Sequence, residues 1–166
     1  MKRLLPLLLV AILAGFFACS RNPEKLPAST AIVYSNDQVR QQVPFAVCGD
    51  TAYAQVNSVW LKEFYPDFRA ELFRQGVVKW DERFDCNHFA TYYAALAQTR
   101  FYLASWGSST TAQSLAVGTF WYQAPRGGHA IIVAITERGR IFIEPQTGEE
   151  VKLTPAQIDS AFFRLF

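Results

Sequence analysis

Apolar residues at helical spacing predict two helices in the first half of the chain. Between residues 54 and 64 they recur every three or four positions, which is typical of a helix with one buried face. The apolar positions are Val56, Val59, Trp60 and Phe64. Pro66 interrupts this pattern. We therefore predict a second helix that Asp67 caps and that runs to about Gln75, with Gly76 as its stop signal.

A longer helical pattern follows Asp85, a residue type that often caps helices. Its apolar residues fall on one side of a helix. They are Cys86, Phe89, Ala90, Tyr93, Leu96, Ala97 and Phe101. The pattern places a cysteine in the first turn of a buried stripe.

The second half of the chain carries strand patterns separated by turn signals. The predicted strands are Leu115 to Gln123, Ala130 to Thr136, Arg140 to Glu144 and Glu150 to Leu153. Residues 137–139 are typical of a tight hairpin turn, and a last helix is predicted from Pro155 to about Phe163. Helices first and strands afterwards predict an α+β fold, with N-terminal helices and a central cysteine-bearing helix packed on an antiparallel sheet.

The N-terminal segment has the layout of a secretory signal. Lys2 and Arg3 precede an apolar run over residues 4–18, and Cys19 follows small residues, as in a bacterial lipoprotein. We expect a lipoprotein-type signal peptide at 1–18, lipidation of Cys19, a tether at 19–30 and one domain at 31–166. Ser20, directly after the cysteine, favours sorting of the lipoprotein to the outer membrane, with the domain facing the periplasm. Ordinary secretion and an uncleaved signal anchor are the alternatives.

Charge and cysteine content narrow the function classes. The formal net charge of +2 comes without a basic stripe, so nucleic-acid binding has little support. If Cys19 is lipidated, Cys48 and Cys86 remain in a compartment where disulfides form, and a bridge between them is one interpretation.

The predicted hairpin brings a histidine and a glutamate together. His129 begins one strand after a glycine turn, and Glu144 ends the partner strand, so both lie at the open end of the hairpin. A helix N-terminus favours the thiolate of Cys86, an imidazole can take its proton, and a carboxylate can orient the imidazole. The negative charge of Asp85 disfavours the thiolate of Cys86, unless the carboxylate is turned to cap the helix.

The segments FDCNHFA, GGHAIIVA and IFIEPQTGE resemble, in this order, the papain-like and transglutaminase-like cysteine hydrolases. The pattern is most similar to the C-terminal cysteine-protease domain of a fungal galactose-binding agglutinin, over residues 80–148. The resemblance implies Cys86 as nucleophile, His129 as general base and acid, and Glu144 as the orienting residue. Gln146 is an alternative third member, and Asn87 is a candidate for the oxyanion hole.

These features predict an exported, lipid-anchored thiol peptidase or amidase, with transglutaminase-type transfer as a variant. The expected substrate is a peptide or protein, with a peptidoglycan stem peptide as one candidate. No cofactor is required, and the resemblance alone implies calcium. The alternative is a non-catalytic envelope lipoprotein or binding module with Cys86 inert or disulfide-bonded, since a cysteine on an apolar helix face is usually core. Zinc held by Cys86, His88 and His129 has less support, because a Cys-x-His spacing splays the ligands.

Overall fold

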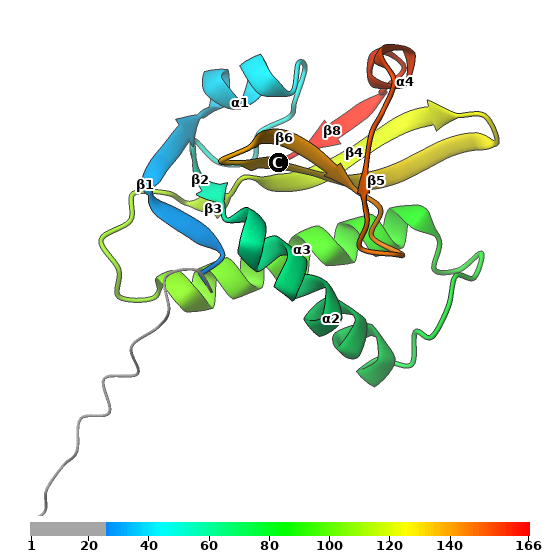
Figure 1. Ribbon diagram of the computed structural model, residues 1–166, viewed down its shortest axis with the longest axis horizontal. Coiled ribbons are helices and arrows are strands. Elements are labelled where there is room, and N and C mark those ends of the chain that lie inside the picture. Colours follow the sequence, from blue (N-terminus) through cyan, green and yellow to red (C-terminus); the bar gives the residue numbers. More distant parts are fainter. Residues whose placement is uncertain (1–25) are drawn as a thin grey trace, which may run out of the picture.

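The computed structural model describes residues 26–166. The predicted signal peptide and Cys19 lie outside these residues. Eight strands form one sheet, and four helices surround it (Figure 1). The helices are α1 (Asn36–Gln42), α2 (Ser58–Arg74), α3 (Cys86–Ser105) and α4 (Pro155–Asp159). The strands are β1 (Ala28–Ser35), β2 (Ala52–Val56), β3 (Ser114–Leu115), β4 (Val117–Ala124), β5 (Gly127–Thr136), β6 (Gly139–Ile143), β7 (Glu150–Val151) and β8 (Phe163–Leu165).

The sheet is mixed. Its main path runs β1-β2-β5-β4-β8, β3 pairs with β2, and β6 pairs with both β5 and β7. Strand β2 is parallel to β3 and β5, whereas the other pairs are antiparallel. The long helix α3 packs across β3, β4 and β5. In Figure 1, α2 and α3 lie on one side of the sheet, and α1 and α4 lie toward the other.

The predicted α+β, papain-like class with an antiparallel sheet is wrong. The chain begins with strands: β1 and β2 enter the sheet before α2, and β2 makes it mixed through its parallel pairs. The sequence pattern missed β2 because four of its five residues are buried, so apolar and polar positions do not alternate. Strand β1 also begins at Ala28, inside the range predicted as tether, and the domain boundary at 31 stays a prediction.

The first predicted helix begins later than its pattern suggested and continues through the proline. Asn57 caps α2, because its side-chain oxygen accepts hydrogen bonds from the N–H groups of Val59 at 2.9 Å and Trp60 at 3.3 Å. Pro66 lies inside α2, and one helix replaces the two that were predicted. Buried rings of Phe64 and Phe68 on either side of the proline pack against Tyr93 of α3, and this packing offsets the lost backbone hydrogen bond.

The predicted hairpin is confirmed, and the C-terminal segment differs from its prediction. Strands β5 and β6 pair from Ile132↔Ile143 to Thr136↔Gly139, and Gly139 has a φ of 87°, which suits glycine at a tight turn. The last helix ends at Asp159, and residues 163–165 form β8 because the edge of β4 offers unpaired backbone groups. No helix within residues 26–166 is long and apolar enough to span a bilayer.

Candidate binding site around Cys86

Cys86 is the first residue of α3, and the residues around it form a capping box. Asp85 is the N-cap: its Oδ1 accepts the N–H of Asn87 at 3.2 Å and lies 2.8 Å from Nδ1 of His88. Partial burial raises the pKa of Asp85, but the hydrogen bonds with His88 and Asn87 outweigh it and lower the pKa overall. The carboxylate is thus turned to the helix, the arrangement in which its charge opposes a thiolate least.

His129 and Glu144 form a close pair at the open end of the β5–β6 hairpin. Nε2 of His129 lies 2.7 Å from Oε2 of Glu144, and their side chains are 26% and 18% exposed. The other carboxylate oxygen, Oε1, accepts the backbone N–H of Gln146 at 3.2 Å. Within residues 26–166, Nδ1 of His129 has no hydrogen-bond partner. The glutamate therefore fixes the ring and leaves its second nitrogen available to a ligand.

Tyr122 connects this pair to Cys86. It faces His129 across β4 and β5, and the two rings meet edge to face with their centroids 5.8 Å apart. Burial is the main cause that raises the pKa of Tyr122, and negative charge on Glu144 and on Cys86 raises it further. The contacts of the described residues join Tyr122 to His129 and His129 to Glu144, and Cys86 is related to them through this charge effect. Cys86, His129, Glu144 and Tyr122 form what we call the thiol cluster.

Tyr122 was not predicted from the sequence, although a signal for it exists. Residues directly opposite each other in an antiparallel pair project from the same face of the sheet. The pair Ala124↔Gly127 closes a turn at residues 125–126, and counting back from this turn places Tyr122 opposite His129. The strand register would have identified Tyr122, but assigning the register requires the exact position of the turn. Strand β5 begins at Gly127 and not at the predicted Ala130.

Gln146, the alternative third member predicted from the sequence, supports the position of Glu144 through its backbone. Its N–H supports Glu144, and its carbonyl oxygen accepts the hydroxyl of Tyr65 from α2 at 2.6 Å. Gly148 closes the same turn, because its N–H donates to the carbonyl of Glu144 at 2.7 Å. A Cβ at Gly148, whose φ is 76°, would collide with the ring of Tyr65. Tyr65 and Gly148 thus hold the turn that carries the carboxylate.

Asn87 and His88 both contact the residue that caps α3. The backbone N–H of Asn87 donates to Asp85, and the oxyanion role predicted for Asn87 stays a prediction. His88 is paired with Asp85, and its ring stacks on Phe84 with the centroids 5.5 Å apart. Within residues 26–166 no group of three or more His, Cys, Asp or Glu side chains could hold a metal ion.

Cys48 and Cys86 are free thiols in the structure. Cys48 lies near the start of β4, since Gly49 donates its N–H to the carbonyl of Phe166, and residues 165–166 border Gly118.

A broad surface hollow of about 540 Å³ lies beside the segment that leads into α3. It is lined by Gly76, Val77, Val78, Lys79, Asp81, Arg83 and Phe84. Phe84 connects this hollow to the helix, because its ring meets that of Phe89 edge to face with the centroids 4.9 Å apart.

Comparisons with known proteins place this fold beside a lectin. No family model and no curated protein sequence matches the chain. A solved structure described as a complex of PSL1a with E64 is 18% identical, with a TM-score of 0.56, and the match covers 81% of this chain and 51% of that one. A structure of Polyporus squamosus lectin bound to Neu5Aca2-6Galb1-4GlcNAc is 19% identical, with a TM-score of 0.58, over 81% of this chain and 49% of that one. The chain therefore spans about half the length of these relatives in structure.

These comparisons correct the functional interpretation of the sequence. Both solved structures are of a lectin, so the identification as a papain-like or transglutaminase-like cysteine hydrolase is wrong, and with it the predicted thiol-peptidase or amidase activity. The physical difference lies in the fold: β1 and β2 join the sheet ahead of α2, and β2 pairs in parallel with β3 and β5. The comparisons favour the alternative, a binding module, and a bound ligand in place of a peptide or peptidoglycan substrate.

Proposed function

We propose that the chain is a ligand-binding module of the cell envelope whose binding site is the thiol cluster. The observation that carries the proposal is the 2.7 Å pair of His129 and Glu144, which lies beside Tyr122 and turns one imidazole nitrogen to a ligand. Attachment through a lipid on Cys19, at the outer membrane facing the periplasm, is part of the proposal and rests on residues 1–19 of the sequence. The roles given to Cys86, His129 and Glu144 now concern binding and not turnover.

The ligand class that suits the cluster is a small acidic molecule with an electrophilic carbon. Cys86 is partly exposed at a helix N-terminus, where the positive end of the helix dipole favours an acidic group. His129 can accept or donate a proton next to the ligand. E64, which one solved neighbour is described as binding, is an epoxysuccinyl compound with these properties. The sulfur of Cys86 attacks an epoxide carbon, the C–O bond breaks, and the oxygen takes the thiol proton to become a hydroxyl.

Mass spectrometry of the protein after incubation with E64 tests this proposal. We expect a mass increase of one whole E64 molecule, because ring opening releases no leaving group, and we expect the adduct on the peptide that contains Cys86. The Cys86→Ser variant should not react. Cys48 provides the matched control, since it is the other partly exposed free thiol of residues 26–166, and Cys48→Ser should react like the unmodified chain.

The His129→Ala variant separates a built site from an ordinary reactive thiol. We expect its reaction with E64 to slow by at least about tenfold. A positioned acid–base group contributes at least about a hundredfold to the rate of a catalysed step, so a tenfold loss is a modest expectation. Equal rates with and without His129, or labelling of Cys48 in preference to Cys86, would refute the proposal that this cluster is the binding site.

Carbohydrate binding is the second candidate, because the other solved neighbour is described with a sialylated trisaccharide. Trp80 lies in the segment beside the hollow and is 51% exposed, so it offers an aromatic face against which a sugar ring can pack. Calorimetric titration with Neu5Aca2-6Galb1-4GlcNAc should then give saturable binding that Trp80→Ala abolishes. Trp106→Ala, which changes an exposed tryptophan elsewhere, should leave it intact, and no heat of binding would exclude this candidate.

A further inference from the structure

The last turn of α3 exposes three large apolar side chains that the candidate binding site does not use. Tyr102 is 57%, Leu103 52% and Trp106 72% exposed. The rings of Tyr102 and Trp106 meet edge to face with their centroids 5.3 Å apart, so they form one surface. We call these three residues the α3-end patch. It lies at the opposite end of α3 from Cys86.

The chain that follows Arg100 carries no charge through this patch and beyond it. From residue 101 to residue 125 there is no Asp, Glu, Lys or Arg, and the last turn of α3 contains no basic residue. Water-facing helix ends normally carry charged side chains, and aromatic residues without charged neighbours are typical of the boundary between water and lipid. Tryptophan and tyrosine are favoured there because one edge of each ring is polar and the rest is apolar.

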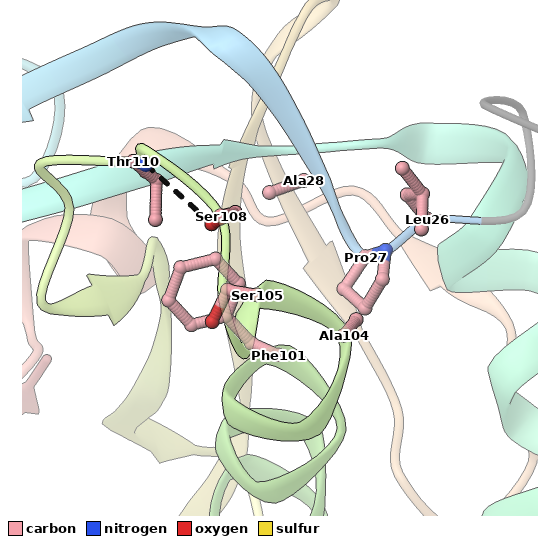
Figure 2. A pocket seen from close by; sticks show the side chains of 8 residues that line it. All are labelled: Leu26, Pro27, Ala28, Phe101, Ala104, Ser105, Ser108 and Thr110. Carbon is pink, nitrogen blue, oxygen red and sulfur yellow. Dashed lines mark hydrogen bonds between the residues drawn. The ribbon is translucent and has the colours of Figure 1, made fainter. Parts of the chain in front are cut away.

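The first described residues of the chain pack next to the same helix end. Figure 2 shows Leu26 and Pro27 beside Phe101 and Ala104, around a pocket of about 100 Å³. The backbone carbonyl of Pro27 accepts the N–H of Asn57 at 2.9 Å, so the place where the chain enters the domain is fixed. Ser108, from the loop after α3, lies on the other side of this pocket.

The length of the preceding segment limits how far this helix end can lie from a membrane. Six residues lie between Cys19 and Leu26, and the seven residue-to-residue steps reach roughly 25 Å at about 3.6 Å each when fully extended. This limit on the distance applies whether the chain is attached through a lipid on Cys19 or through the apolar run at residues 4–18 remaining in the bilayer. In both cases Leu26, which lies beside the end of α3, stays within roughly 25 Å of the point of attachment.

We propose that the α3-end patch docks onto the surface of the phospholipid bilayer, with Trp106 and Tyr102 inserted at the headgroup level. The proposal rests on membrane attachment through residues 1–19. Docking orients the domain: because Cys86 begins the same helix and the patch ends it, the thiol cluster is held away from the membrane by the length of α3. Twenty residues at 1.5 Å each place it about 30 Å along the helix axis.

Fluorescence quenching by brominated lipids tests this proposal on the full chain. The protein is reconstituted into phosphatidylethanolamine and phosphatidylglycerol vesicles, with and without bromine on the acyl chains. We expect the brominated vesicles to quench part of the tryptophan emission and the variant Trp106→Phe to lose that part. Trp80→Phe is the matched control, since it removes another exposed tryptophan outside the patch, and it should keep the quenching.

A second variant tests the patch without removing the reporter. Tyr102→Ser with Leu103→Ser leaves Trp106 in place, and we expect its quenching to fall while the near-ultraviolet circular dichroism of the core stays unchanged. Quenching that survives Trp106→Phe, or a chain that does not co-float with vesicles, overturns the proposal. So does Trp106 emission that changes with protein concentration and not with bromine, because a second copy would then cover the patch.

Discussion

At the scale of single residues, the carboxylate of Glu144 is held by more groups than its pairing with His129 requires. One oxygen lies 2.7 Å from the imidazole, and the other accepts a backbone N–H of its own turn. That turn packs on Tyr65, which bonds the carbonyl of Gln146. Since both oxygens have partners, the carboxylate cannot rotate without losing a hydrogen bond, and the imidazole keeps one orientation before any ligand arrives.

Replacing Gly148 should show how strongly this turn is supported. In Gly148→Ala the new Cβ meets the ring of Tyr65 and the φ of 76° disfavours any side chain. We expect a loss of about 3 kcal/mol in the free energy of unfolding, about 1 from the backbone and the rest from the collision. Gly107→Ala has a similar φ of 73° with open space around it, so urea unfolding should show only about 1 kcal/mol for this control. Equal losses would mean that contact with Tyr65 is unimportant.

The buried hydroxyl of Tyr93 offers a second test. Tyr93 is fully buried, and its hydroxyl has no hydrogen-bond partner within residues 26–166. Burial raises its pKa well above the ordinary value. We expect Tyr93→Phe to keep or raise the free energy of unfolding, by up to about 1 kcal/mol, because an unsatisfied polar group is removed. Tyr53→Phe is the control: its hydroxyl accepts the N–H of Asp50 at 2.8 Å, so denaturation should show a loss of about 1 kcal/mol.

At the scale of the elements, the strongest local signals were the easiest to predict. The stripe from Phe89 to Phe101 predicted α3, and its capping residue Asp85 stands where the sequence indicated. The hairpin turn at residues 137–139 fixed the register that brings His129 and Glu144 together. Strands β2 and β8 were missed because their pairing partners lie far away in the sequence, and a short apolar run does not reveal them.

The cap of α3 should make stability depend on pH. The pKa of Asp85 is lower in the folded chain than its ordinary 3.8, so its charge stabilises the fold above about pH 4. This contribution is lost as the pH falls through the lower folded value. We expect Asp85→Ala to cost about 1 kcal/mol at pH 7 and less at pH 2.5, measured by urea unfolding.

Asp37, in the first turn of α1, serves as the control for the cap. It is an acidic residue of a first turn that is not the cap, because Ser35 fills that role. Asp37→Ala should therefore change the free energy of unfolding by less than about 0.5 kcal/mol at pH 7. A cost for Asp85→Ala that is the same at both pH values would show that the charge of the carboxylate contributes nothing.

At the scale of the whole molecule, the sequence predicted the local parts better than their assembly. Patterning indicated a central helix packed on a sheet, and α3 packs on β3, β4 and β5 in the structure. They could not show that β1 and β2 join this sheet or that β2 runs parallel to β5, since parallel pairing joins Val56 to the distant Thr136. The same difference applies to the function. Local spacing was enough to place the cluster, whereas its assignment to a hydrolase depended on a resemblance that the fold comparison corrected.

The contact between Tyr65 and the turn at residues 144–149 has a mechanical consequence. Tyr65 belongs to α2, and the bonds Tyr65 to Gln146, Gln146 to Glu144 and Glu144 to His129 form an unbroken series from that helix to β5. Any shift of α2 relative to the sheet must stretch one of these three links or carry the imidazole along. The orientation of the imidazole therefore depends on the position of a helix to which it is joined only through this series of bonds.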